Sequence, residues 1–172
     1  MKVIARYNMN FFMYVYLTII RHTWSKCISV INKLFMKNSK INEGYQVLNR
    51  LKECKTPKDL EYLYRELDFK YKSDILDYAS KPEVTCYNRG GDCDDFAELS
   101  YNILKEHHYN NVYKVYMFKK MSGHVVTIID NSYFNYHMMN NMYCITYKGI
   151  LHDFIMNFGM VGGVDSYIIV KN

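Results

Sequence analysis

The residues of this chain with the clearest capacity for chemistry are Cys93 and His124. Cys93 comes shortly after Gly90 and Gly91, which have the backbone freedom for a sharp entry into a helix, and Asp92 is a typical N-cap. Apolar residues then recur at helical spacing: Phe96, Leu99 and Ile103. We therefore expect the thiol in the first turn of a helix, where the helix dipole favours the nucleophilic thiolate.

His124 is the expected partner of this thiol, because it follows Gly123 and opens a run with a β-strand pattern. An imidazole accepts the proton of a thiol and later returns it to a leaving group. As a cation it also offsets the three nearby carboxylates that oppose a thiolate: Asp92, Asp94 and Asp95. Such a pair requires no cofactor.

Two other interpretations of Cys93 stay open. A free cysteine is often a buried structural thiol. The aspartates around it also suggest metal ligands, but no second cysteine lies at C-x-x-C spacing, and the glycine and distal glutamate of a calcium loop are missing. We therefore expect no metal ion at this site.

A third residue must hold the imidazole of His124 in one orientation, usually a carboxylate or an amide on a neighbouring strand. If the chain turns near residues 130–132, the residues opposite His124 fall between about 137 and 141, which favours Asn140. Asn141 and Asn135 remain alternatives, because one residue of register changes which side chain faces the site.

The oxyanion of an acyl-transfer reaction needs two donors. We expect the backbone N–H of Cys93 and one side chain, for which Asn88 or Tyr87 is close enough in sequence, and we choose Asn88. Four other histidines are not expected to be catalytic: His107, His108, His137 and His152.

Composition indicates a folded protein without a nucleic-acid partner. The chain has 172 residues, 49% of them hydrophobic, which supports a packed core. Its net charge is +5, but the first 40 residues carry +7, so the rest of the chain carries −2. The five irregularly spaced cysteines do not resemble a disulfide framework, which favours a reducing, cytoplasmic compartment.

Residues 1–40 are expected to form a basic, apolar helical leader ahead of a catalytic domain at 41–172. The apolar run Met9–Ile20 is shorter than a membrane-spanning helix, and no signal-peptide cleavage pattern follows it. After it, Trp24 to Phe35 shows a basic amphipathic pattern, which suits either packing on the domain or peripheral contact with an anionic membrane. Asn38–Gly44 is expected to be a polar linker.

Helical patterns come first and strand patterns follow, which predicts an α+β fold. Helices are expected at Tyr45–Glu53, from a Thr56 N-cap to Leu67, and from Cys93 onward. Strands are expected at Val112–Phe118, His124–Ile129, Tyr133–Met138, Tyr143–Tyr147 and Ser166–Val170, with a hairpin turn at Asp130–Ser132.

Two motifs resemble the transglutaminase-like cysteine peptidase family, in the broad papain-like superfamily. They are Gly91-Asp92-Cys93-Asp94-Asp95-Phe96-Ala97 and Gly123-His124-Val125-Val126. The approach to the cysteine is also similar, with Thr56-Pro57, Phe69-Lys70-Tyr71, Asp74 and Pro82. The resemblance covers about residues 45–145 and leaves the leader unexplained.

The resemblance implies a helix that carries the cysteine, packed on an antiparallel sheet that carries the histidine, with Asp or Asn on the adjacent strand. It also implies a cysteine-dependent hydrolase or acyl transferase for amide or peptide bonds, of a kind found in bacteria and phages. This chain has no aspartate at the expected third position, although asparagine also orients an imidazole in papain-like enzymes.

The alternative is a non-catalytic module that keeps the fold and binds a peptide or protein partner. A third interpretation, a membrane-tethered cell-wall amidase, requires the leader to act as an export signal. The sequence does not determine the oligomeric state.

Overall fold

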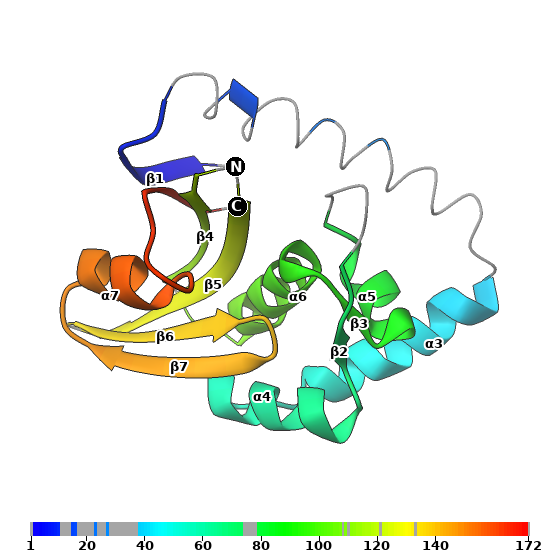
Figure 1. Cartoon of the computed structure of the whole chain (residues 1–172). Helices are drawn as coiled ribbons and strands as arrows, with labels where there is room; N and C mark the ends of the chain where they lie inside the picture. The colour runs from blue at the N-terminus through cyan, green and yellow to red at the C-terminus, as the bar shows by residue number, and fades with distance from the viewer. Residues whose placement is uncertain are drawn as a thin grey trace.

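A six-stranded antiparallel sheet, ordered β1-β8-β4-β5-β6-β7, is the framework of the fold (Figure 1). Its strands are β1 (Lys2–Tyr7), β4 (Val112–Lys119), β5 (Ser122–Ser132), β6 (Asn135–Asn140), β7 (Tyr143–Lys148) and β8 (Ser166–Lys171). A second, two-stranded parallel sheet joins β2 (Lys70–Tyr71) to β3 (Gly90–Gly91). The structure, a computed structural model, describes residues 2–10, 15–16, 23, 27, 38–73, 79–107, 109, 111–120, 122–132 and 134–171.

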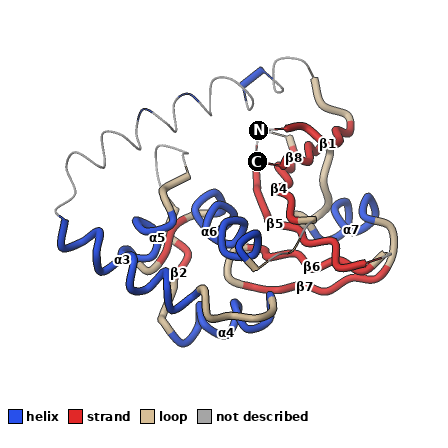
Figure 2. The backbone as a smooth tube through the Cα atoms, turned by 180° about the vertical axis from the view of Figure 1, so that it is seen from behind, coloured by secondary structure: helices blue, strands red, loops and turns tan. Residues whose placement is uncertain are grey.

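Helices cover the main sheet unequally, as two opposite views show (Figures 1 and 2). They are α3 (Asn38–Leu51), α4 (Pro57–Glu66), α5 (Pro82–Asn88), α6 (Cys93–Glu106) and α7 (Leu151–Phe158). Helices α3 to α6 gather on one side of the molecule, whereas α7 lies apart from them, beside β6 and β7. The α+β fold expected from the sequence is the fold observed.

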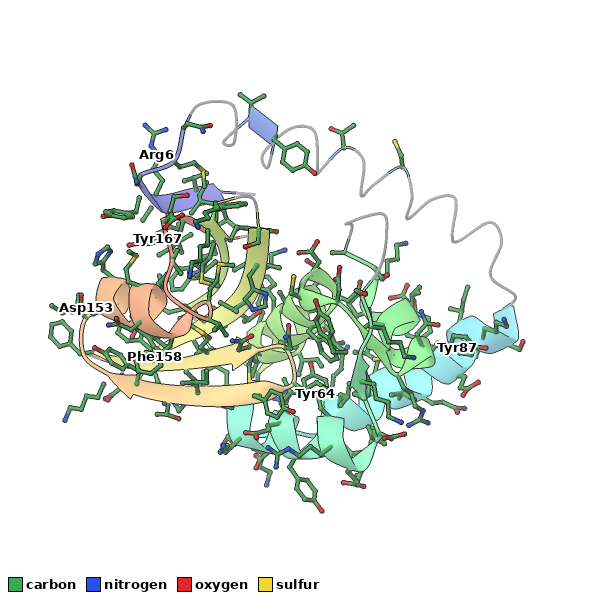
Figure 3. All side chains as sticks on the ribbon, viewed as in Figure 1. Arg6, Tyr64, Tyr87, Asp153, Phe158 and Tyr167 are labelled. Atoms are coloured by element: carbon green, nitrogen blue, oxygen red, sulfur yellow. The ribbon has the colours of Figure 1, made fainter. Side chains whose placement is uncertain are left out.

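Each face of the sheet has its own apolar core. Side chains from α3, α4, α5 and α6 pack with three sheet residues, Val112, Ile129 and Met139. On the other face, Phe154 and Ile155 of α7 pack with Val126 and Ile128 of β5. The labelled side chains in Figure 3 show the separation, with Tyr64 among the helices and Phe158 on α7.

Helix α4 begins as its sequence predicts. The Oγ1 of Thr56 accepts a hydrogen bond from the Asp59 N–H at 3.2 Å, and Oδ2 of Asp59 accepts one from the Thr56 N–H at 2.9 Å. This reciprocal capping box satisfies donors that the first turn of a helix leaves unpaired. The helix then packs on α6, where Tyr64 Oη lies 2.9 Å from Ser100 Oγ.

The strands after α6 agree closely with those expected from period-two patterns. The hairpin between β5 and β6 is placed differently, because β5 continues to Ser132 and β6 begins at Asn135. A register shift between Asp130 and Ser132 and a positive φ of 61° at Phe134 accompany this later turn.

Two local features differ from those expected. Residues 38–44, expected to be a linker, are helical in α3, since packing of the helix on α5 outweighs the polar composition. Pro82 occupies the first turn of α5, where a proline is well tolerated. Helix α7 was not identified from the sequence at all.

Residues 2–7 form β1 and pair with β8, although they were expected to belong to a helical leader. The apolar run and the basic helix expected between residues 11 and 37 lie outside the described residues, apart from single positions. Among the helices that the structure describes, none has the length and apolar character required to span a bilayer.

Candidate active site

The N-terminus of α6 is built around aspartate side chains. Oδ1 of Asp92 accepts hydrogen bonds from the N–H groups of Asp94 and Asp95 at 3.0 and 3.3 Å, and Oδ2 of Asp95 accepts one from the Asp92 N–H at 3.2 Å. Oδ1 of Asp95 also accepts a hydrogen bond from the Ser80 N–H at 2.6 Å. These bonds fix the first turn of the helix, which begins at the partly exposed Cys93.

Two glycines make the entry to this helix possible. A Cβ on Gly91 would lie 2.1 Å from Oδ2 of Asp95, and a Cβ on Gly90 would lie 2.1 Å from the Lys70 carbonyl oxygen. Gly90 also has a φ of +151°, which residues with a side chain rarely adopt. The glycines therefore allow β3 to approach β2 and the helix cap closely enough to deliver Cys93.

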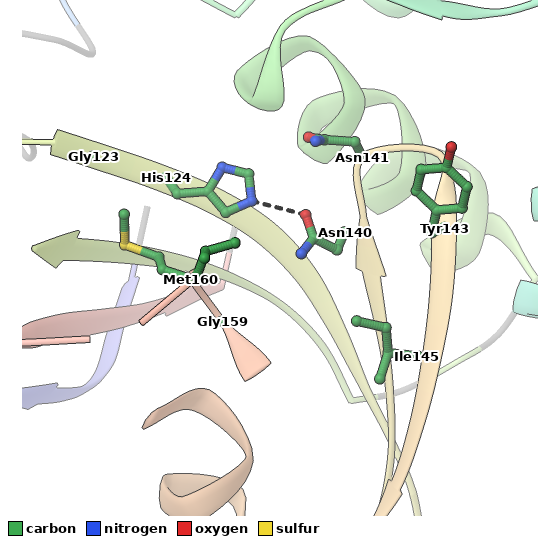
Figure 4. Close-up of a pocket in the computed structure, with 9 residues that line it drawn as sticks. Gly123, His124, Asn140, Asn141, Tyr143, Ile145, Gly159 and Met160 are labelled. Carbon is green, nitrogen blue, oxygen red and sulfur yellow. Dashed lines mark hydrogen bonds between the residues drawn. The ribbon is translucent and has the colours of Figure 1, made fainter. Parts of the chain in front are cut away.

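His124 lies near the start of β5 and is hydrogen-bonded to Asn140 at the end of β6 (Figure 4). Nε2 of His124 lies 2.8 Å from Oδ1 of Asn140. Because an amide oxygen only accepts, Nε2 carries the proton and Nδ1 is the basic nitrogen of the neutral ring. Burial lowers the pKa of His124, while the hydrogen bond that His124 donates to Asn140 acts in the opposite direction.

Helix α6 runs along β5 with its first turn directed toward the His124 end. Oγ1 of Thr127 donates a hydrogen bond to the Ala97 carbonyl oxygen at 2.8 Å. The other end of α6 leads into β4, whose first residue, Val112, pairs with Ile129 of β5. Cys93 therefore lies about 6 Å from Ala97 along the helix axis, toward the end of the helix that is nearer the start of β5.

The start of β5 has an open edge on its β6 side. The pairing of β5 with β6 begins at Thr127 with Met139, three residues after His124. Since Thr127 faces α6, strand alternation directs His124 to the opposite side of β5, with Val126 and Ile128.

The other expected residues have separate locations. Asn135 lies at the opposite end of β6 from Asn140, about 17 Å away at the rise of a strand. Asn141 is in the β6–β7 turn with a φ of +53°. Asn88 is exposed at the end of α5, where its backbone carbonyl accepts a hydrogen bond from Lys72 Nζ at 2.5 Å, so its role as an oxyanion donor stays a prediction.

A groove adjoins the His124–Asn140 pair, and sequence reasoning did not identify its walls. We call it the His124 groove. It has a volume of about 580 Å³ and is lined by Gly123, His124, Asn140, Asn141, Tyr143, Ile145, Gly159, Met160 and Val161. Residues 159–161 follow α7 and are far from His124 in sequence, with no motif that could have linked them to the site.

The aspartates near Cys93 are also candidate metal ligands by residue type. Within the part of the chain that the structure describes, no group of three or more His, Cys, Asp or Glu side chains has an arrangement that could hold a metal ion. Asp92, Asp94 and Asp95 are 4–8% exposed, and the first and last of them act in the helix cap.

Comparison with known proteins gives one family. A family model described as a transglutaminase-like domain matches residues 25–153. Among solved structures, calcium-bound LapG of Legionella pneumophila is similar, with 15% sequence identity, a TM-score of 0.48, and coverage of 83% of this chain and 81% of that chain. No curated protein sequence matches this chain.

Proposed function

The chain belongs to the transglutaminase-like domain family, and from that membership we propose that it is a cysteine-dependent hydrolase or acyl transferase for amide or peptide bonds. Cys93 is the nucleophile, His124 the general base and acid, and Asn140 the residue that orients the imidazole. The proposal assigns catalysis to residues 41–172, with a peptide or protein as the substrate.

In the first half of the reaction, the sulfur of Cys93 attacks the carbonyl carbon and its proton passes to Nδ1 of His124. The carbonyl oxygen becomes an oxyanion, for which the backbone N–H of Cys93 and the carboxamide of Asn88 are the proposed donors. Nδ1 then gives its proton to the leaving amine as the carbon–nitrogen bond breaks. A thioester on Cys93 and a free amine result.

In the second half, Nδ1 of His124 accepts a proton from a water molecule or an incoming amine, which attacks the thioester. The carbon–sulfur bond breaks, and Nδ1 returns the proton to the thiolate of Cys93. Water gives a carboxylic acid and an amine gives a new amide. We favour hydrolysis, because transfer to an amine requires the exclusion of water from the acyl-enzyme.

The observation that carries this proposal is the 2.8 Å contact between His124 Nε2 and Asn140 Oδ1. It fixes the ring so that Nδ1 is the nitrogen available for proton transfer. The direction of α6, which brings its first turn toward the end of β5 that carries His124, also supports the proposal.

Selective alkylation tests the proposal. The full-length protein would be treated with iodoacetamide at pH 6, where an ordinary thiol is less than about 1% thiolate, and each cysteine quantified by peptide mass spectrometry. Exposed Cys27 is the internal reference. Burial raises the pKa of Cys54 and Cys144 to about 11 and that of Cys86 to about 12, so these thiols should react slowest.

We expect Cys93 to react roughly tenfold faster than Cys27 or more, and to lose this advantage in His124→Ala. Equal labelling of Cys93 and Cys27, or a rate that does not depend on His124, would contradict the enzyme. Those results would favour a binding module with the same fold.

A further inference from the structure

The His124 groove has walls without charge. None of its nine lining residues is Asp, Glu, Lys or Arg, and four present apolar or aromatic surface: Tyr143, Ile145, Met160 and Val161. Its volume is within the range of about 300–1,000 Å³ that is typical of ligand pockets. A charged group entering it would lose water and meet no Asp, Glu, Lys or Arg side chain in the lining, whereas an apolar group would gain from burial.

One polar atom of the groove lacks a partner. Oδ1 of Asn141 is buried and has no hydrogen-bond partner among the described residues. A buried acceptor of this kind is costly unless a donor arrives to fill it. Figure 4 shows the Asn141 side chain beside that of Asn140, extending from the β6–β7 turn toward the end of β5 that carries His124.

The position of this acceptor relates it to the reaction. Asn140 is already bonded to the imidazole, and Asn141 is its neighbour in the chain, about 3.8 Å away between Cα atoms. A ligand that donates a hydrogen bond to Asn141 and also enters the groove therefore lies next to His124. A peptide supplies both features, because each residue carries a backbone N–H and a side chain.

We propose that the His124 groove binds an uncharged, apolar side chain of the substrate next to the scissile bond, and that Oδ1 of Asn141 accepts a hydrogen bond from the substrate backbone. The inference rests on the proposed function for its place in catalysis, since it names the side-chain class that this site selects. Asn141 is then a positioning residue for the substrate, while Asn140 positions the base.

Binding without turnover tests this inference separately from the chemistry. The full-length Cys93→Ala protein, carrying isotope-labelled methionine methyl groups, would be titrated with blocked tripeptides that have a central leucine, glutamate or lysine. The methyl resonance of Met160, identified with Met160→Leu, reports on the groove by NMR. We expect the leucine peptide to shift this resonance with an affinity roughly tenfold higher than the glutamate or lysine peptide.

Val161→Lys is a second variant that changes the groove without threatening the fold, because Val161 is fully exposed, at 100%. Its added charge at the rim should raise the affinity of the glutamate peptide relative to the lysine peptide. Equal affinities for all three peptides, or no shift of the Met160 resonance with any of them, would overturn the inference, even if Cys93 proved reactive.

Asn141→Gly tests the acceptor with a residue that tolerates the positive φ of this turn. We expect a roughly fivefold loss of affinity for the leucine peptide, and Asn141→Asp, which retains an acceptor oxygen, should lose less. A set of depsipeptides would replace each backbone N–H in turn by an ester oxygen. The one that lacks the N–H bonded to Asn141 should show the same loss of affinity in the Cys93→Ala protein, and no loss when Asn141→Gly is added. If the amide and every ester form bind the parent protein equally, Asn141 does not contact the substrate backbone.

Discussion

Two regions of this molecule pair a histidine of the sheet with a cysteine, one by the proposed function and the other by direct contact. They differ in the surroundings of the histidine and of the sulfur. At the His124 site, Nε2 is bonded to Asn140 and Nδ1 is the basic nitrogen. In the second region, on β6 and β7, Nδ1 of His137 lies 4.0 Å from Cys144 Sγ and 3.2 Å from Thr146 Oγ1. Here a thiol and an imidazole meet directly, yet the surroundings oppose a thiolate.

The surroundings of Cys144 are those of a structural thiol. Burial raises the pKa of Cys144 to about 11; of the two nearby charges, Lys58 acts against this increase and Glu61 adds to it, and burial prevails. Oε2 of Glu61 accepts a hydrogen bond from the Cys144 N–H at 3.3 Å. Cys93 instead begins a helix, where backbone dipoles favour an anion. On the proposed function, contact between sulfur and imidazole is therefore insufficient by itself, and the surroundings of the sulfur distinguish Cys93 from Cys144.

The largest effect should come from removing each sulfur in turn. With p-nitrophenyl acetate as a simple acyl donor, Cys93→Ala should lower the rate of enzyme acetylation by roughly a thousandfold or more, because the nucleophile is lost. Cys144→Ala should stay within about twofold of the parent protein. Intact-protein mass spectrometry measures the acetyl adduct. A larger loss of acetylation rate in Cys144→Ala than in Cys93→Ala would show that Cys144, and not Cys93, is the nucleophile.

Removing each imidazole should have the next largest effect. His124→Ala should slow acetylation of Cys93 by roughly a hundredfold, because general-base catalysis contributes about that much or more. His137→Ala, the matched control, should leave the rate unchanged. A similar loss in both variants would indicate a general effect on folding, which circular dichroism would detect.

Asn140 should have a smaller effect that depends on pH. Asn140→Ala should cost about tenfold in the acetylation rate, since the imidazole keeps its chemistry but loses its orientation. The reaction needs neutral His124, so the parent rate should rise with pH through a pKa below the ordinary value of about 6.5, because burial lowers it. In Asn140→Asp a nearby carboxylate favours the imidazolium, and the midpoint should move to higher pH. If the pH midpoint of the rate is the same in Asn140→Asp as in the parent protein, residue 140 does not affect the ionisation of His124.

The smallest effect concerns stability. Burial lowers the pKa of His124 and of His137, so the unfolded chain binds more protons than the folded one between each folded pKa and about 6.5. The free energy of unfolding should be insensitive to these groups above about pH 6.5, should fall as the pH drops from about 6.5 toward each folded pKa, and should level off below it. Urea unfolding at several pH values should show a flatter decline for His124→Gln, and a steeper one would contradict the burial argument.

Local signals in the sequence were sufficient for the elements that carry the pair. Asp92 caps α6, and Cys93 begins that helix, because capping depends on residues within one turn. The strand patterns located β5 and β6 well enough that Asn140 was expected opposite His124, although the hairpin turn came later than expected.

Features that depend on distant parts of the chain were not predictable in the same way. The wall of the groove formed by residues 159–161 depends on how α7 packs against β7, where Phe154 stacks on Tyr147 with ring centres 4.8 Å apart. Residues 2–7 were expected to be part of a leader, because nothing near them in sequence indicates pairing with β8. Long-range pairing of this kind leaves little trace in composition or periodicity.

The pairing of β1 with β8 places the beginning and the end of the chain side by side at one edge of the sheet (Figure 1). Ile168 and Val170 of β8 are fully covered there, in part by Val3 and Met9. A shortened protein that starts at Asn42 would uncover this apolar ribbon together with its unpaired backbone groups, and such ribbons recruit other chains into aggregates. Insolubility of that truncated form would then report a missing strand, and membrane affinity of the first forty residues is better examined by point substitutions in the intact chain.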